Sequence, residues 1–112
     1  VDYLIIDLQA IINSTSENEI VTSIELIRRM YNVRIIIIAE GYKEGNVLLG
    51  RIFNLGIYNI VTARNDVIFS DEIEKVFSAE GMTFGNAMKY KINDNMLVIN
   101  KTTKVVKENI NI

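Results

Sequence analysis

The stretch RIIIIA at residues 34–39 places four isoleucines in a row with no polar residue between them. β-Branched residues favour strands, and a run without polar alternation is typical of a parallel strand buried on both faces. Two further stretches resemble strands, namely DYLIID at residues 2–7 and YNIV at residues 58–61. Because residues 2–7 also lack alternation, we expect them to form an interior strand buried on both faces.

A first helix is predicted over residues 17–31, where apolar residues recur at helical spacing. Ser16 precedes this segment, and together with Glu19 it matches the pattern of a capping box. Asn32 follows it and is expected to end the helix in a left-handed conformation. Residues 8–16 are rich in turn-forming side chains towards their end, so we expect them to form a loop.

A second helix is predicted over residues 44–55, ended by Gly56, although Gly50 should weaken it by up to about 1 kcal/mol relative to alanine. A third helix is predicted to begin after Ser70 as its N-cap and to stop at Gly81. Strands that alternate with helices indicate an α/β fold, in which a parallel sheet carries helices on both faces. The sequence contains three such βα units.

The pattern changes after the third helix, so we divide the chain into βα units over residues 1–80 and a tail over residues 81–112. Residues 82–90 are expected to form one turn of helix or a loop. Residues 96–100 and 103–107 have the composition of two short strands, and the tail is expected to form a hairpin or a linker to another domain.

The composition excludes several classes of function. The chain has 112 residues, which suits one domain, and its net charge of −2 argues against a surface for nucleic acid. It contains no cysteine and no histidine, which removes thiol nucleophiles, the usual zinc sites and imidazole acid–base catalysis. No signal peptide is visible, and no apolar run approaches the roughly 18 residues that a membrane span needs. We therefore expect a cytoplasmic protein.

Residues 1–79 resemble the second half of a response-regulator receiver (CheY-like) domain. Three stretches carry the resemblance, namely DYLIIDL at 2–8, RIIIIAE at 34–40 and LGIYNIVTAR at 55–64, in the order and at the spacing of that family. The resemblance implies a flavodoxin-like fold. It covers three of the five βα units of a complete receiver, so we expect an incomplete sheet.

The resemblance places Asp7 at the position of the phosphoacceptor aspartate. Ala39 falls where receivers carry a threonine or serine, and Ala63 falls where they carry a lysine that pairs with the phosphoryl group. Arg64 replaces the proline of the family, and the acidic pair that holds magnesium belongs to an earlier strand. The resemblance therefore implies a degenerate site with no metal, no cofactor and no enzymatic activity.

Two functions remain open from the sequence. The first is a noncatalytic pseudo-receiver that regulates through protein–protein or intramolecular contacts. The alternative is a working phosphoacceptor domain, modified on Asp7 by a histidine kinase with Mg²⁺. A small metal-dependent enzyme is disfavoured, because only two carboxylates, those of Asp7 and Glu40, are expected to converge there. Receiver-like domains without the full site also precede partition-type P-loop ATPases, although this chain has no GKT or GKS motif.

The expected partner is therefore another protein, a neighbouring ATPase domain or a second copy of the chain, and neither nucleic acid nor membrane. The residues proposed for the contact surface share apolar or aromatic character and follow the expected strands and helices: Tyr42, Tyr58, Met82, Phe84 and Met88. Two interpretations stay open for the last three residues. They form an exposed docking stripe, or they close the core beneath the tail.

Overall fold

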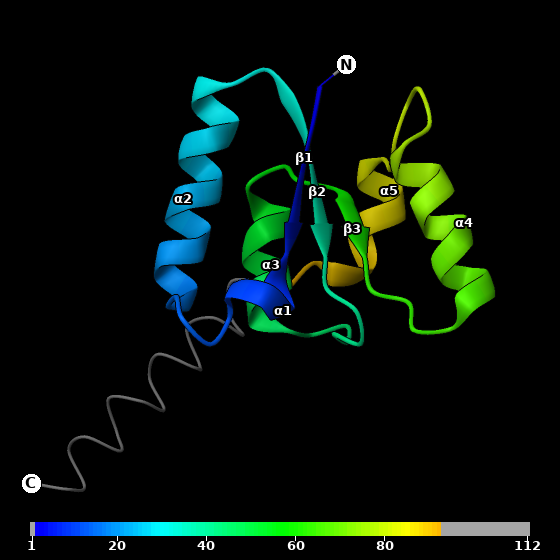
Figure 1. Ribbon diagram of the computed structural model, residues 1–112, viewed down its shortest axis with the longest axis horizontal. Helices are drawn as coiled ribbons and strands as arrows, with labels where there is room; N and C mark the ends of the chain where they lie inside the picture. Colours follow the sequence, from blue (N-terminus) through cyan, green and yellow to red (C-terminus); the bar gives the residue numbers. More distant parts are fainter. Residues whose placement is uncertain (1, 93–112) are drawn as a thin grey trace, which may run out of the picture.

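The structure, a computed structural model, describes residues 2–92, and within them the chain forms a three-stranded parallel sheet. The strands are β1 (Asp2–Asp7), β2 (Val33–Ile38) and β3 (Asn59–Val61), and they lie side by side in the order of the sequence (Figure 1). The predicted α/β class and the parallel sheet are confirmed. The hairpin expected at residues 96–100 and 103–107 lies outside the described residues.

Helices cover the two faces of the sheet, and shorter helical turns follow β1 and close the described chain. In chain order they are α1 (Leu8–Ile11), α2 (Glu17–Met30), α3 (Val47–Asn54), α4 (Asp66–Val76), α5 (Phe84–Ala87) and the 3₁₀ turn η1 (Met88–Tyr90). Figure 1 shows α2 and α3 on one side of the strands and α4 on the other. Each face therefore has its own hydrophobic core.

Alternation along β2 assigns its isoleucines to the two cores. Ile35 and Ile37 belong to the larger core, which β2 shares with α2 and α3. Ile36 belongs to the smaller core, where it packs with Val61 of β3 and Val76 of α4. All three isoleucines are buried, as expected for the strand at the centre of the sheet.

β1 differs from the prediction, because it is an edge strand and not an interior one. Its neighbour on one side is β2, and on the other side the described residues provide no strand. Tyr3 is 43% exposed and Ile5 is 54% exposed, although both lie on the face that α4 covers elsewhere. The apolar run was a misleading signal because it reports the character of the side chains and not the number of neighbouring strands.

Side-chain caps explain two further differences from the prediction. Leu8–Ile11 is a helical turn and not a loop, because the Asp7 carboxylate accepts from the backbone N–H of Gln9 and caps it. α4 begins at Asp66 and not after Ser70, because the Asn65 side chain accepts from two backbone N–H groups of the first turn. The helix ends at Val76, well before Gly81.

The ends of α2 and α3 match the prediction in part. The Ser16 hydroxyl accepts from the backbone N–H of Glu19, which confirms it as the cap of α2. The expected left-handed Asn32 is wrong, since no non-glycine residue in the described part of the chain has a positive φ. Gly56 has φ of 86° directly after α3, which confirms the predicted glycine stop. α3 starts at Val47, three residues later than expected.

Residues 82–92 cover the outer edge of β3, and 82–90 include both a helical turn and a 3₁₀ turn. The Asn59 side chain of β3 accepts from the backbone N–H of Met82 at 2.8 Å. Tyr90 is buried and its hydroxyl lies 2.6 Å from the Thr62 hydroxyl. The Ile92 side chain packs against Gly50 of α3. One edge of the sheet is therefore protected, whereas β1 forms the other.

Candidate functional site

The carboxyl ends of the three strands meet at one edge of the sheet, where ligands of open α/β sheets bind. Asp7 ends β1, Ala39 follows β2, and Ala63 lies just beyond β3. The structure therefore brings the strand ends that carry these three residues to the same side of the molecule. Only Asp7 has a side chain with a functional group, so its surroundings decide the chemistry.

Asp7 is exposed, and its Oδ1 accepts a hydrogen bond of 3.0 Å from the backbone N–H of Gln9. This bond is the N-cap of α1. Across residues 2–92, no lysine or arginine nitrogen lies within the 4.0 Å of an ion pair with this carboxylate. The same residues hold no group of three acidic side chains placed to bind a metal. The carboxylate thus has a structural partner and lacks a cationic one.

The side chain of Gln9 extends across the neighbouring strand end. Its Nε2 donates to the backbone carbonyl of Glu40 at 3.1 Å, which ties α1 to the loop after β2. Because its backbone N–H also binds Asp7, Gln9 links the ends of β1 and β2. Sequence reasoning did not identify Gln9, and a glutamine after a strand carries no pattern that would reveal this role.

Ala39 and Ala63 contribute backbone groups and no side-chain chemistry. Ala39 is fully buried, and its N–H donates to the carbonyl of Val61 at 2.8 Å. The N–H of Ala63 donates to Oε1 of Glu72 at 2.9 Å, and the N–H of Thr62 donates to the same oxygen at 3.2 Å. Glu72 of α4 therefore holds the segment after β3. The side chain at each position is a methyl group, which neither donates nor accepts a hydrogen bond.

The loops after β2 and β3 are held close together. The N–H of Gly41 donates to the carbonyl of Thr62 at 2.8 Å, and Gly41 has φ of 82°. A Cβ at Gly41 would collide with the guanidinium of Arg64, so this cation lies directly against the loop. Arg64 thereby brings a positive charge to the edge between β2 and β3, but not into ion-pair range of Asp7.

A polar pocket of about 430 Å³ lies at this same end of the sheet. Its walls combine two lysines, one glutamate, one threonine and two tyrosines, namely Tyr42, Lys43, Glu44, Thr62, Lys89 and Tyr90. The Lys89 ammonium lies 5.2 Å from the centre of the Tyr90 ring, which is a cation–π contact. Tyr42 therefore belongs to a mixed-charge pocket and lies apart from the other aromatic residue proposed for recognition, Tyr58.

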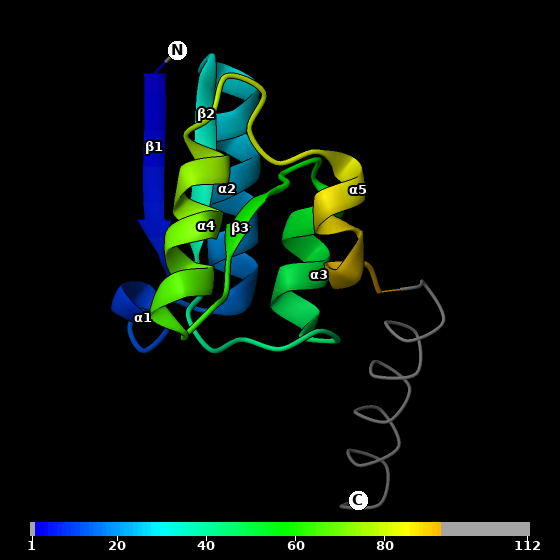
Figure 2. The ribbon, with the colours of Figure 1, turned by 90° about the vertical axis from the view of Figure 1, so that its right-hand side faces the viewer.

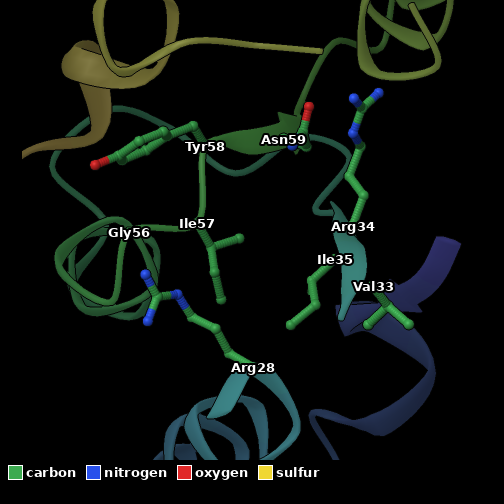
Figure 3. A pocket seen from close by; sticks show the side chains of 8 residues that line it. All are labelled: Arg28, Val33, Arg34, Ile35, Gly56, Ile57, Tyr58 and Asn59. Carbon is green, nitrogen blue, oxygen red and sulfur yellow. The ribbon is translucent and has the colours of Figure 1, made fainter. Parts of the chain in front are cut away.

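Tyr58 lies at the opposite end of the sheet, beside a cavity of about 150 Å³ (Figure 3). Two arginines line this cavity, but they differ in what they do. Arg28 reaches from the end of α2 toward Gly56, whereas Arg34 points away toward the end of α4. Arg34 donates there to backbone carbonyls, so Arg28 alone of the two directs its charge toward the cavity.

Of the other three residues proposed for contact, Met82 is partly buried, whereas Phe84 and Met88 are exposed. Met82 packs partly buried against the smaller core. Phe84 is 46% exposed, yet its ring centre lies 5.6 Å from Tyr58 and 5.3 Å from Phe53. Met88 is 49% exposed and follows Phe84 by one helical turn. We call Tyr58, Phe84 and Met88 the aromatic patch.

No protein-family model, no curated protein and no solved structure matches this chain. Among residues 2–92, none of the helices has both the length and the apolar character that crossing a bilayer requires.

Proposed function

We propose that this chain is a noncatalytic interaction module with a flavodoxin-like, receiver-like fold. The observation that carries the proposal is the state of Asp7. Its carboxylate caps α1 through Gln9, and in the described part of the chain no cation lies within ion-pair distance of it. The order of three parallel strands, with helices on both faces, supports the flavodoxin-like assignment.

The energetics of phosphoryl transfer support the same proposal. This chemistry depends on metal ions and cationic side chains that stabilise charge on the transferred group. Removing one comparable donor costs about 3–4 kcal/mol of transition-state stabilisation. Ala39 and Ala63 supply methyl groups at two such positions. A phosphoryl group on Asp7 would also lack differential contacts with which to favour one conformation over another.

The aromatic patch is the surface that we assign to partner binding. It combines an edge-to-face aromatic pair, Tyr58 and Phe84, with the exposed thioether of Met88. Aromatic residues and methionine are enriched in protein interfaces, and adjacent exposed apolar residues mark such surfaces. The chemistry fits an apolar segment of another protein, or of a neighbouring ATPase domain in a cytoplasmic setting.

A separate groove of about 280 Å³ lies between α4 and the α5–η1 segment. Ile68 and Met82 supply its apolar part, and both acidic and basic side chains line it, among them Glu72 and Lys89. Mixed charge of this kind suits a polypeptide better than the uniform negative charge of nucleic acid. The residues that line this groove come from α4 and from residues 82–89.

The proposal predicts that beryllofluoride and Mg²⁺, which mimic a phosphoryl group on aspartate, leave the protein unchanged. We expect the amide NMR signals of Gln9 and Ala39 to keep their positions when millimolar beryllofluoride and Mg²⁺ are added. The Asp7→Asn variant is the control, because asparagine retains a capping oxygen and cannot accept the mimic. Signal shifts in the parent chain that Asp7→Asn abolishes would establish the phosphoacceptor alternative.

A photo-cross-linking amino acid at Phe84 tests the interaction surface in the cells that express the protein. We expect discrete adducts with a specific protein when the cross-linker replaces Phe84. The matched control places it at Leu26 of α2, an equally exposed apolar residue outside the patch. The same adducts from both positions, or none from Phe84, would remove the aromatic patch as the contact surface.

A further inference from the structure

In the described part of the chain β1 is an edge strand, and its middle lacks the bulge, proline and lysine by which proteins protect such edges. All six of its residues pair in continuous register with β2, so it contains no bulge, and the chain has no proline. No lysine interrupts the run Leu4-Ile5-Ile6. Figure 2 shows β1 at the margin of the molecule, with α1 at its carboxyl end. An edge of this kind is a template for pairing with another strand.

We propose that two copies of the chain pair through β1 in antiparallel orientation and form one continuous six-stranded sheet. The two-fold axis stands perpendicular to the sheet, so the contact is the same on both copies and closes at the dimer. This inference goes beyond the proposed function and uses a different surface, because the aromatic patch lies on the α3 and α5 side of the molecule.

The charges on the sheet select the second copy as the occupant. On the face that α4 covers, the described strands carry two charged side chains, Arg34 beside the amino end of β1 and Asp7 at its carboxyl end. An antiparallel copy places its Asp7 opposite Tyr3 of the first molecule, and the other neighbour of Tyr3 is Arg34, so opposite charges occupy one row of side chains on both sides of the axis. A parallel copy joined through the same edge would be turned over, so its Asp7 and Arg34 would lie on the opposite face and could not complete this row.

The alternation of side chains restricts the register of this pairing. Residues directly opposite each other in an antiparallel pair project to the same face. With Ile5 on the axis, Tyr3 faces Asp7 of the second copy, and Leu4 faces Ile6. The Tyr3 hydroxyl is then a donor for that carboxylate. Arg34 pairs with Tyr3 on the neighbouring strand, and its Cζ lies 5.6 Å from the centre of the Tyr3 ring. The row of side chains across the sheet therefore continues from Tyr3 to a cation.

The opposite face of β1 also favours an apolar occupant. A groove of about 320 Å³ runs between β1 and α2, lined by Leu4 and Ile6 of the strand and by Ile20, Ile24 and Ile27 of the helix. In the proposed register, Leu4 and Ile6 of the second copy stand beside the mouth of this groove. Both faces of β1 therefore present apolar side chains to the partner strand, as pairing of identical strands requires.

Sedimentation equilibrium on the full chain tests the proposal. We expect a species of about twice 12.8 kDa at high micromolar concentration. Ile5→Lys should weaken association by about tenfold or more, because it places two ammonium groups on the axis. Val67→Lys is the matched control, since Val67 is 70% exposed on α4. A monomer at every concentration, equal effects of both variants, or assembly beyond the dimer would overturn the proposal.

Cysteine cross-linking provides a second measurement that does not depend on the lysine variant. Because the chain has no cysteine, Ile5→Cys introduces a single thiol on the proposed axis. We expect mild oxidation to convert this variant into a disulfide-linked dimer, while Val67→Cys stays monomeric. An Ile5→Cys chain that remains reduced and monomeric would overturn the pairing, and it would leave the assignment of the aromatic patch unaffected.

Discussion

The guanidinium of Arg34 on β2 donates a hydrogen bond of 2.9 Å to the backbone carbonyl of Val76, the last residue of α4. It also donates to the carbonyls of Ser78 and Ala79, just beyond the helix. The last carbonyls of a helix have no partner within it. A single side chain from the sheet therefore provides hydrogen-bond donors for the carbonyl groups at the end of α4 and fixes the position of this end of the helix.

This relationship predicts a large loss of stability in Arg34→Met, which keeps the length of the side chain and removes its donors. We expect the free energy of unfolding to fall by about 2 kcal/mol, with a smaller loss for Arg34→Lys, whose compact ammonium cannot reach the spread of carbonyls. Urea denaturation measures both. Arg29→Met is the control, since its exposed pair with Glu25 should contribute less than about 0.5 kcal/mol. Equal losses at the two positions would contradict the role of Arg34.

The bond between the Tyr90 and Thr62 hydroxyls predicts a measurable coupling energy. Tyr90 is buried, and its hydroxyl ties η1 to the end of β3. We expect Tyr90→Phe and Thr62→Val each to destabilise the fold by about 1 kcal/mol, and the double variant to lose less than the sum. Thermal unfolding of the four proteins completes the cycle. Full additivity would show that the two hydroxyls do not depend on each other.

At Gly50 of α3, we expect alanine to give a less stable fold than glycine. In an open helix Gly→Ala stabilises by up to about 1 kcal/mol. Here a Cβ would collide with the Ile92 side chain, so we expect Gly50→Ala to destabilise by about 1–3 kcal/mol. Adding Ile92→Ala should abolish the clash, so Gly50→Ala should then no longer destabilise the fold. Chemical denaturation of the single and double variants checks both effects, and a stabilised Gly50→Ala would refute the contact.

Gly41 and Gly45 form a matched pair for separating backbone strain from crowding. Both have positive φ, 82° and 88° respectively. A Cβ at Gly45 meets open space, whereas a Cβ at Gly41 meets the Arg64 guanidinium. We expect Gly45→Ala and Gly41→Ala each to lose about 1–2 kcal/mol from the left-handed conformation, because the Arg64 guanidinium is the end of an exposed, flexible side chain and can move away from a Cβ at Gly41. A clearly larger loss for Gly41→Ala that Arg64→Ala removes, as measured by denaturation, would show that the guanidinium is held in place.

The sequence predicts most reliably those features that depend on neighbouring residues. The isoleucine run of β2, the Ser16 cap of α2 and the stop at Gly56 all have causes within a few residues. The start of α4 was harder, because Asn65 and Ser70 are both capping residues. The structure selects Asn65, whose side chain accepts from two N–H groups.

Features that depend on distant residues were not predictable. Glu72 of α4 accepts from the backbone N–H groups of Thr62 and Ala63 after β3, and no pattern near Glu72 in the sequence indicates these partners. Gly50 was interpreted as a weakness of α3, and it makes room for Ile92. The edge position of β1 belongs to the same class, because the number of strands beside it is a property of the assembled sheet. At the candidate site, the sequence located Asp7 but not its capping of α1.

The order of the sheet has a consequence for the nascent chain on the ribosome. β1 pairs with a strand 31 residues further on, β2 with one 23 residues further on, and each new strand is added on the same side. The growing flank closes last, when residues 82–92 emerge and cover β3. Until then the partly folded domain has an unpaired edge strand on each side of the sheet, namely β1 and β3. We therefore expect slower translation of residues 82–92 to lengthen the time for which the edge of β3 is exposed to aggregation.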